Sequence, residues 1–167
     1  MGILGSWSAM RRYLEREMLA DALRGRIRYG CTRYVGMDGH RIFEICVDGE
    51  QIKRFSLETV NSFFIEQGHK TNLYPFGILG YWDGFLMLLD KCPLGSRTEY
   101  TDEEFCSALE KYRNQNVQVS LHSPDPIVKM FSILDRRVGR KSLKALEEEI
   151  ADRPKWLQFF YRLRIQR

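Results

Sequence analysis

Residues 41–55 read RIFEICVDGEQIKRF and decide the fold. Apolar and polar side chains alternate on both sides of Asp48-Gly49, a dipeptide that favours a type I′ turn between two antiparallel strands. The two-residue turn sets a register of three cross-strand pairs: Val47 with Glu50, Ile45 with Ile52, and Glu44 with Lys53. Because this register gathers isoleucines on one face and opposite charges on the other, the stretch predicts a β-hairpin.

The segments on either side of the hairpin extend it into a larger unit. Alternation over residues 26–32 predicts a strand before the hairpin. Apolar residues at helical spacing predict a helix that is capped by Ser6 and stops at Gly25, and a second helix over 57–67. Residues 6–67 are therefore expected to form an α-β-β-β-α unit, a three-stranded antiparallel meander packed on helices.

The second half of the chain carries mostly helical patterns. Thr101-Asp-Glu-Glu104 is a capping box that opens a helix to about Asn114. Asp125-Pro126 opens another helix, for which Gly139 is the expected stop. Residues 78–90 fit either an amphipathic helix or a hairpin around Asp83-Gly84, and the pattern favours the helix.

Length and composition suit one domain. The chain has 167 residues, of which 44% are hydrophobic and 13% aromatic, which excludes wholesale disorder. We expect one α+β domain over residues 1–167, with a helical C-terminal half over 78–167 that extends the unit at 6–67. The longest uncharged apolar run, 84–89, is too short to cross a bilayer, so no membrane partner is expected. Four widely spaced cysteines without a C-x-x-C pair predict buried free thiols and a cytoplasmic location.

The net charge of +4 is unevenly distributed. Residues 1–35 carry seven cations and three anions, and residues 124–167 carry eleven and six. The middle, 36–123, carries eight cations and thirteen anions. Either the basic ends fold against the acidic middle, or they form an exposed basic face for nucleic acid or an acidic protein. Arginines beside apolar residues make the last helix one candidate contact: Arg162, Arg164 and Arg167 with Phe159 and Leu163.

Residues 134–143 read LDRRVGRKSL, four cations and one carboxylate around Gly139. A left-handed Gly139 would end one helix and let the next begin, with Arg136 and Arg137 in the last turn. Asp135 would take a bidentate contact from Arg140 or from an arginine elsewhere. That is the structural interpretation of this joint. The functional hypothesis is a non-enzymatic interaction module that binds an acidic partner, a protein, through four cations of the joint: Arg136, Arg137, Arg140 and Lys141.

The order helix, three-stranded meander, helix over residues 6–67 is that of the double-stranded-RNA-binding domain. The stretch GMDGHRIFEICVDG at 36–49 resembles the glycine-and-histidine loop and following strand of that family. The resemblance implies that His40 reaches an RNA minor groove. Where the family carries phosphate-gripping lysines, this chain has Ser56-Leu-Glu-Thr-Val-Asn61, and its Glu58 would repel RNA. The alternative function is RNA binding by this unit through Arg24, Arg26 and Arg28 on the first strand, together with His40.

The sequence contains no recognised catalytic or metal-binding motif. Its histidines, His40, His69 and His122, have no motif partner, and Cys31 and Cys46 share no zinc spacing with His40. We therefore expect no catalytic residues, no metal and no cofactor. An enzyme remains a third hypothesis, which a deep pocket that gathers His40 or His69 with carboxylates would support.

Three stretches together carry a resemblance over nearly the whole chain: Trp7-Ser-x-x-Arg-x-x-Leu-Glu15, Leu23-x-Gly-Arg-Ile-x-Tyr29, and residues 134–143. They resemble an uncharacterised family of small bacterial cytoplasmic proteins. The resemblance implies a bacterial origin, a cytoplasmic location and a common fold. It brings no activity and no site residues.

Overall fold

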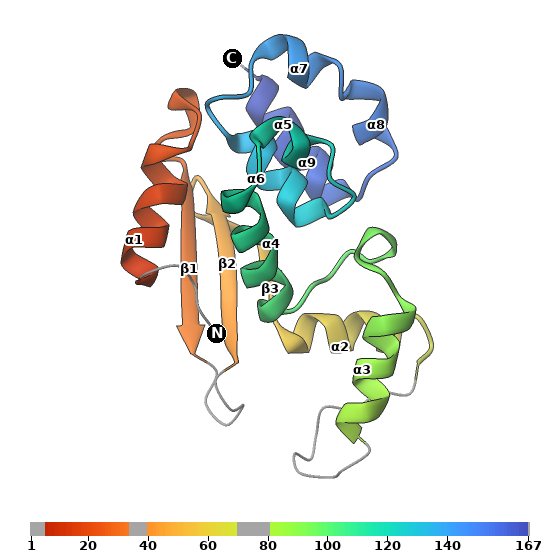
Figure 1. Ribbon diagram of the computed structural model, residues 1–167. Helices are drawn as coiled ribbons and strands as arrows, with labels where there is room; N and C mark the ends of the chain where they lie inside the picture. Colours follow the sequence, from red (N-terminus) through yellow and green to blue (C-terminus); the bar gives the residue numbers. More distant parts are fainter. Residues whose placement is uncertain (1–5, 34–39, 70–80, 167) are drawn as a thin grey trace.

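The computed structural model describes residues 6–33, 40–69 and 81–166. A helical segment precedes a three-stranded antiparallel sheet, and helices follow the sheet to the end of the chain (Figure 1). The expected α+β class and the order α-β-β-β-α followed by a helical half are confirmed.

The sheet is a meander in the order β1-β2-β3. Its strands are β1 (Ile27–Arg33), β2 (Arg41–Val47) and β3 (Glu50–Phe55). Asp48 and Gly49 both have positive φ, 52° and 87°, as a type I′ turn requires, and Val47 pairs with Glu50. The predicted hairpin and its turn are confirmed.

The register beyond the turn differs from the prediction. A bulge between Ile45 and Cys46 places Ile45 opposite Lys53 instead of Ile52, and Glu44 opposite Arg54 instead of Lys53. An unbroken ladder would set Arg54 opposite Phe43, on the face that packs against the core. The bulge shifts β3 by one residue, so that Phe55 pairs with Phe43 and both side chains are buried.

The bulge also turns Lys53 inward, where its side chain is 5% exposed. Its ammonium group donates to the Thr98 carbonyl at 2.7 Å and to Glu99 at 2.7 Å. The same nitrogen lies 5.5 Å from the ring centre of Tyr100 and 5.6 Å from that of Trp156. Aromatic faces and a carboxylate thus compensate the buried charge.

The first helical segment is shorter and less regular than predicted. Ser6 is the N-cap as expected, accepting the Ala9 N–H at 3.2 Å. The helix α1 (Trp7–Arg12) continues into a π-helical turn η1 (Tyr13–Glu17), and a short 3₁₀ turn η2 (Asp21–Leu23) follows. Gly25 has a φ of +82°, but it lies in the turn before β1 and does not end the helix.

Two helices pack on each other beside the sheet (Figure 1). They are α2 (Leu57–Glu66), capped by Ser56, and α3 (Tyr81–Lys91). For residues 78–90 the helical interpretation is therefore confirmed over the described part, which begins at Tyr81. Their apolar contacts form a small cluster apart from the main core: Leu57, Val60, Phe64 and Phe85.

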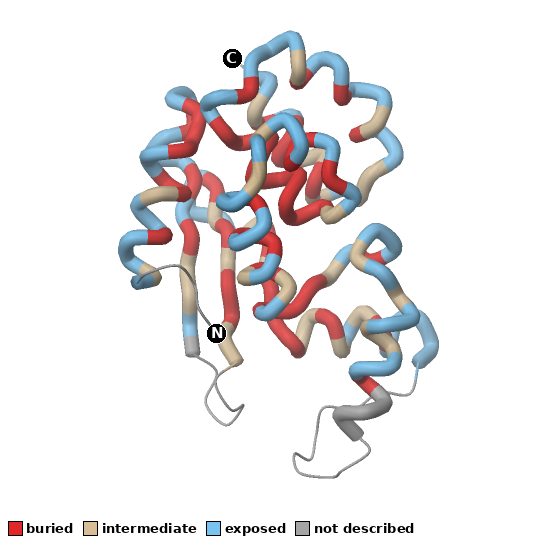
Figure 2. Tube along the Cα trace, viewed as in Figure 1, coloured by how far each residue is buried: buried red, intermediate tan, exposed pale blue. Residues whose placement is uncertain are grey.

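The remaining helices form the C-terminal half. After the short turn η3 (Leu94–Ser96) come α4 (Asp102–Asn114), α5 (Val117–Leu121), α6 (Pro126–Leu134), α7 (Arg140–Lys144), α8 (Glu147–Ala151) and α9 (Lys155–Ile165). The predicted capping box of α4 and the Asp125-Pro126 start of α6 are confirmed. Every residue of α6 is buried, so this helix is the centre of the C-terminal half (Figure 2).

Contacts between aromatic rings connect the sheet to these helices. Phe105 of α4 lies between Phe43 of β2, with ring centres 4.5 Å apart, and Phe131 of α6, at 5.7 Å. Phe55 contacts Phe105 at 4.8 Å. Burial of rings of this size is the largest single contribution to a core, so the sheet and the helical half share one hydrophobic core.

Helix α6 also holds a buried charge. Lys129 is fully buried, and its ammonium group contacts the Leu121 carbonyl at 2.6 Å and Glu149 of α8 at 2.7 Å. Burial opposes the ionisation of Glu149, but hydrogen bonds from Lys129 and Arg153 outweigh it and lower its pKa. A carboxylate with a lowered folded-state pKa stabilises the fold above its unfolded pKa of about 4.5, and that stabilisation is lost as the pH falls.

We therefore predict that Glu149→Gln lowers the melting temperature at pH 7, because Lys129 loses its counterion in the interior. The difference between variant and wild type should shrink as the pH falls from 6 to 3, because the wild type then protonates the same carboxylate. Thermal unfolding followed by circular dichroism across this range measures both values. Glu148→Gln, at an exposed neighbour, is the control and should change neither. A difference that stays constant with pH contradicts the prediction.

Candidate functional site

The joint at residues 134–143 is an extended crossing and not a glycine-terminated helix. Helix α6 ends at Leu134, and Asp135 has extended backbone angles. Gly139 also lies in the extended region, with φ −82° and ψ 167°, and is the N-cap of α7. The predictions of a left-handed Gly139 and of Arg136 and Arg137 in the last helical turn are therefore wrong.

Asp135 ends α6 by local hydrogen bonding. Its side chain accepts the backbone N–H of Arg137, two residues on, at 2.8 Å, as in an Asx turn. The backbone on either side of Asp135 then pairs with the segment after η1. Ala20 donates to the Leu134 carbonyl at 2.9 Å, and Arg136 donates to the Met18 carbonyl at 2.7 Å. This two-stranded bridge ties the start of the chain to its C-terminal half.

The Asp135 carboxylate is completely buried and fully engaged. Tyr112 of α4 donates its hydroxyl to it, and Arg137 donates Nε at 3.0 Å and Nη2 at 2.7 Å. Burial raises the pKa of Tyr112, and its hydrogen bond to Asp135 raises it further. The hydrogen bond with Asp135 also raises the pKa of Arg137. Of the four cations of the joint, Arg137 is thus the one that pairs with a buried carboxylate.

The other three cations of the joint face solvent. Arg136, Arg140 and Lys141 are exposed, and within the described part of the chain none of them forms an ion pair. Arg137 is paired, although 54% of its side chain is exposed. Three of the four predicted partner-binding cations are therefore exposed and without an ion-pair partner among the described residues.

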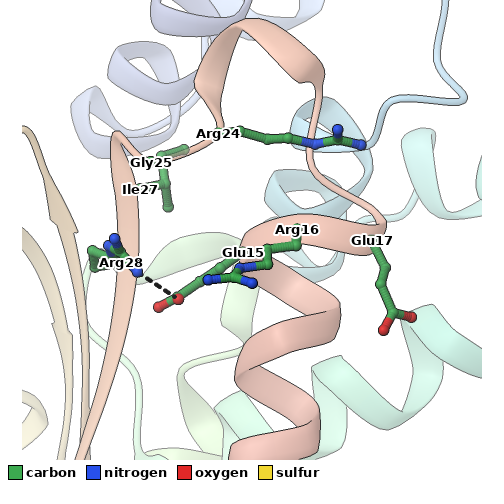
Figure 3. A pocket seen from close by; sticks show the side chains of 7 residues that line it. All are labelled: Glu15, Arg16, Glu17, Arg24, Gly25, Ile27 and Arg28. Atoms are coloured by element: carbon green, nitrogen blue, oxygen red, sulfur yellow. Dashed lines mark hydrogen bonds and ion pairs between the residues drawn. The ribbon is translucent and has the colours of Figure 1, made fainter.

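The bridge brings the two basic ends of the sequence to the same end of the molecule. The segment that leaves η1 lies beside the loop that precedes α7 (Figure 1). Next to this crossing, a hollow of about 580 Å³ opens between η1 and β1 (Figure 3). Three arginines and two glutamates are among its lining residues: Glu15, Arg16, Glu17, Arg24 and Arg28.

Glu15 anchors the inner wall of this hollow. It is in the π-helical turn, and its side chain is 8% exposed. The carboxylate accepts the Tyr29 backbone N–H at 2.8 Å and the Arg28 guanidinium at 3.3 Å, the contact drawn in Figure 3. Glu15 therefore docks the helical segment onto the edge of the sheet. Sequence reasoning missed this residue because its partner on β1 is a backbone amide.

Each residue proposed for RNA has a carboxylate partner. Arg24 contacts Asp21 at 3.0 Å, Arg26 contacts Asp48 at 2.8 Å, and Arg28 contacts Glu15 at 3.3 Å. His40 lies 3.2 Å from Asp102. Only Arg28 of the three arginines is on β1, since that strand begins at Ile27, so the prediction of a stripe along the first strand is wrong. Each of these residues lies beside a carboxylate, so together with their partners they carry little net charge.

Ion pairs in the described residues stay within each region of the sequence. Arg26 with Asp48 is the one pair among them that joins a basic end to the acidic middle. The others, such as Lys53 with Glu99 or Lys129 with Glu149, link residues of the same region. These ion pairs therefore do not support the interpretation in which the basic ends fold against the acidic middle.

A second pocket, of about 470 Å³, lies between α7 and α9. Arg140 of the joint lines it together with Lys144, one helical turn further along α7, and Arg164 of α9. Arg164 was a candidate from the sequence, whereas Lys144 was missed. The signal for Lys144 was present, because residues four apart on a helix share a face.

His40 lines a smaller pocket of about 270 Å³ beside Glu103 and the apolar side of α3. Asp102 orients its imidazole and also accepts the Arg41 N–H at 2.8 Å. Of the residues that line this pocket, Thr101 carries a hydroxyl group, which would be the candidate nucleophile. Its oxygen accepts the N–H of Glu104. The arrangement holds a histidine in place but offers no free nucleophile beside it. The enzyme hypothesis stays open without a catalytic set.

The thiols are half-buried and the described residues group no metal ligands. All four cysteines are free. Burial raises the pKa of Cys106 to about 12, with a further contribution from Asp102, and burial also raises that of Cys31. Such thiols are poor nucleophiles at neutral pH. Within the described ranges no three histidine, cysteine or acidic residues are placed to hold a metal ion.

Comparison with known proteins gives one match. A family model described as the SF0329 protein family matches residues 6–165. This chain belongs to the SF0329 protein family. No curated protein and no solved structure matches it. Among the described residues of this SF0329 family member, no helix is both long enough and apolar enough to span a membrane.

The buried carboxylate of the joint gives a stability prediction. Asp135→Asn keeps the shape of the side chain but removes the charge that Arg137 and Tyr112 contact. We expect the free energy of unfolding to fall by about 1.5–3 kcal/mol, the size of a hydrogen bond to a charged group. Urea denaturation measures this loss. Asp152→Asn, at an exposed position, is the control, and equal midpoints for the two variants would show that the joint does not depend on this charge.

Proposed function

We propose that this protein is a non-enzymatic interaction module that binds an acidic partner protein through the basic joint. One observation carries the proposal: Arg136, Arg140 and Lys141 are exposed and form no ion pair within the described residues. The buried carboxylate of the joint, Asp135, is already engaged by Arg137. A cluster of free cations on a folded surface attracts acidic surfaces and increases the rate at which they associate.

The bridge enlarges this surface. Arg16, an exposed residue of η1, lies two residues before Met18, whose carbonyl accepts the Arg136 N–H. Arg24 adds a guanidinium that is paired with Asp21, whose side chain is 81% exposed. Exposed pairs of this kind contribute only about 0–1 kcal/mol, so an acidic partner can compete for the arginine. The bridge therefore brings backbone segments of both basic ends together, and the proposal includes their exposed arginines.

RNA binding by the N-terminal unit stays a prediction with less support. Arg24, Arg26, Arg28 and His40 each contact a carboxylate. The partners of Arg28 and His40 are the buried carboxylates Glu15 and Asp102, which phosphate would have to displace. Glu15 and Glu17 line the same hollow as two of the arginines. The family resemblance implies a bacterial origin and a cytoplasmic location. We include both in the proposal, so the acidic partner is expected to be a bacterial cytoplasmic protein.

We predict that the double variant Arg136→Glu, Lys141→Glu loses the partner. The tagged chain is incubated with lysate of its native host, with and without nuclease, and retained proteins are identified by mass spectrometry. We expect an acidic protein that the wild type retains after nuclease and releases as the salt rises from 0.1 to 0.5 M, because salt screens the contact. The melting temperature of the double variant should stay near that of the wild type, because both side chains are exposed.

Lys91→Glu, Lys111→Glu is the matched control, since it makes the same charge change at two exposed lysines of α3 and α4. It should retain the partner as well as the wild type does. Equal loss by both double variants would indicate a nonspecific charge effect and would count against the joint. Retention that disappears with nuclease would favour the RNA alternative.

A further inference from the structure

The pocket between α7 and α9 combines positive charge with an apolar wall. Arg140, Lys144 and Arg164 supply three cations to its lining, and Glu147 supplies one anion. Leu143, Tyr161 and Ile165 supply the apolar surface. The volume of about 470 Å³ is in the range of ligand sites, and it is large enough for one bulky side chain with its neighbours.

Arg164 has a donor that the fold does not use. Its Nη2 donates to the Val138 carbonyl at 2.9 Å, which fixes the guanidinium against the joint. Its Nε is buried and has no hydrogen-bond partner in the described structure. A buried donor without an acceptor costs free energy. Because this nitrogen is closed off from solvent, an anion in the pocket is attracted by the positive charge of the guanidinium that lines it and not by a hydrogen bond from Nε.

Arg164 lies near charges of both signs. Burial lowers its pKa, the Asp135 carboxylate raises it, and the nearby Arg140 lowers it, so the guanidinium has one internal anion and one further cation close by. Tyr161, on the same wall, already donates its hydroxyl to the Leu143 carbonyl at 2.7 Å, so its ring presents carbon to the pocket. The lining thus offers guanidinium groups at one side and apolar carbon at the other.

We propose that this pocket binds an acidic segment of the partner in which a carboxylate stands beside a bulky apolar side chain. The carboxylate contacts Arg164 and Arg140, and the apolar side chain packs on Leu143 and the ring of Tyr161. This inference rests on the proposed function, because Arg140 belongs both to the pocket and to the basic joint. It adds a requirement that charge alone does not impose: the acidic segment must carry an apolar residue.

The test is a nuclear magnetic resonance titration of the full chain with two synthetic peptides. The first has two glutamates on each side of one phenylalanine, with both ends blocked, and the second has serine in place of the phenylalanine. We expect the first peptide to shift the Arg164 Nε–H resonance and to bind about tenfold more tightly than the second, the ratio that burial of one aromatic side chain readily supplies.

Two variants locate the binding. Ala22→Phe fills the pocket from its opposite wall, where Ala22 is exposed, and should weaken the first peptide about tenfold or more. Ala151→Phe makes the same change at an exposed position of α8 that is not part of the lining, and should bind as the wild type does. Arg164→Lys keeps the charge but removes the planar guanidinium, and should weaken binding while leaving the chain folded.

The outcomes separate this inference from the proposed function. If the peptide shifts signals of Arg136 and Lys141 but not Arg164, and Ala22→Phe binds as the wild type does, the pocket is not the site and the basic joint still is. Equal binding of the two peptides overturns the apolar requirement. Absence of any shift with either peptide at millimolar concentration counts against both the pocket and the joint.

Discussion

The buried carboxylate of Asp135 is the constraint on which the arrangement of the two halves depends. A charge without access to water must be compensated where it lies, and here Tyr112 and Arg137 supply the donors. These contacts fix α4 against the end of α6. They also hold the backbone in the extended form that pairs with Leu19. The same short segment therefore ends a helix, anchors a second helix and receives the N-terminal segment.

This local compensation explains why the basic surface exists. Asp135 is neutralised by an arginine only two residues away, so the remaining cations of the joint are not needed inside the molecule. The acidic middle likewise finds its cations nearby, as Glu104 does with Arg97 and Glu99 with Lys53. Because the described ion pairs form mostly within each region, they do not cancel the excess positive charge of the two ends, and the backbone bridge joins segments of both ends.

Features determined by a few adjacent residues were predictable from the sequence. The Asp48-Gly49 turn and the caps at Ser6, Ser56, Thr101 and Asp125 depend on hydrogen bonds within about four residues, and all of them are present. The β3 bulge, the π-helical turn and the extended Gly139 were not predictable in this way. Each depends on a contact with a residue distant in sequence. Phe55, which the bulge places in the core, contacts Phe105, and Glu15 of the π-helical turn accepts the Tyr29 N–H. In the joint that contains Gly139, the backbone pairs with Met18.

The candidate site likewise combines a contact between neighbouring residues with a pocket that forms only on folding, and its charges are unevenly placed. The sequence predicted that an arginine would contact Asp135, but it named Arg140 or one elsewhere, and the structure shows Arg137 in that role. The pocket could not be predicted locally, because it needs α9 to pack against α7. Along these helices the charge changes sign within one turn, from Lys144 to Glu147, and Glu147 is exposed at the pocket edge. In the proposed complex, an acidic segment would therefore be repelled from the α8 side and attracted toward Arg140 and Arg164. Its carboxylate would then point toward the joint, the orientation in which one partner contacts the pocket and the exposed cations together.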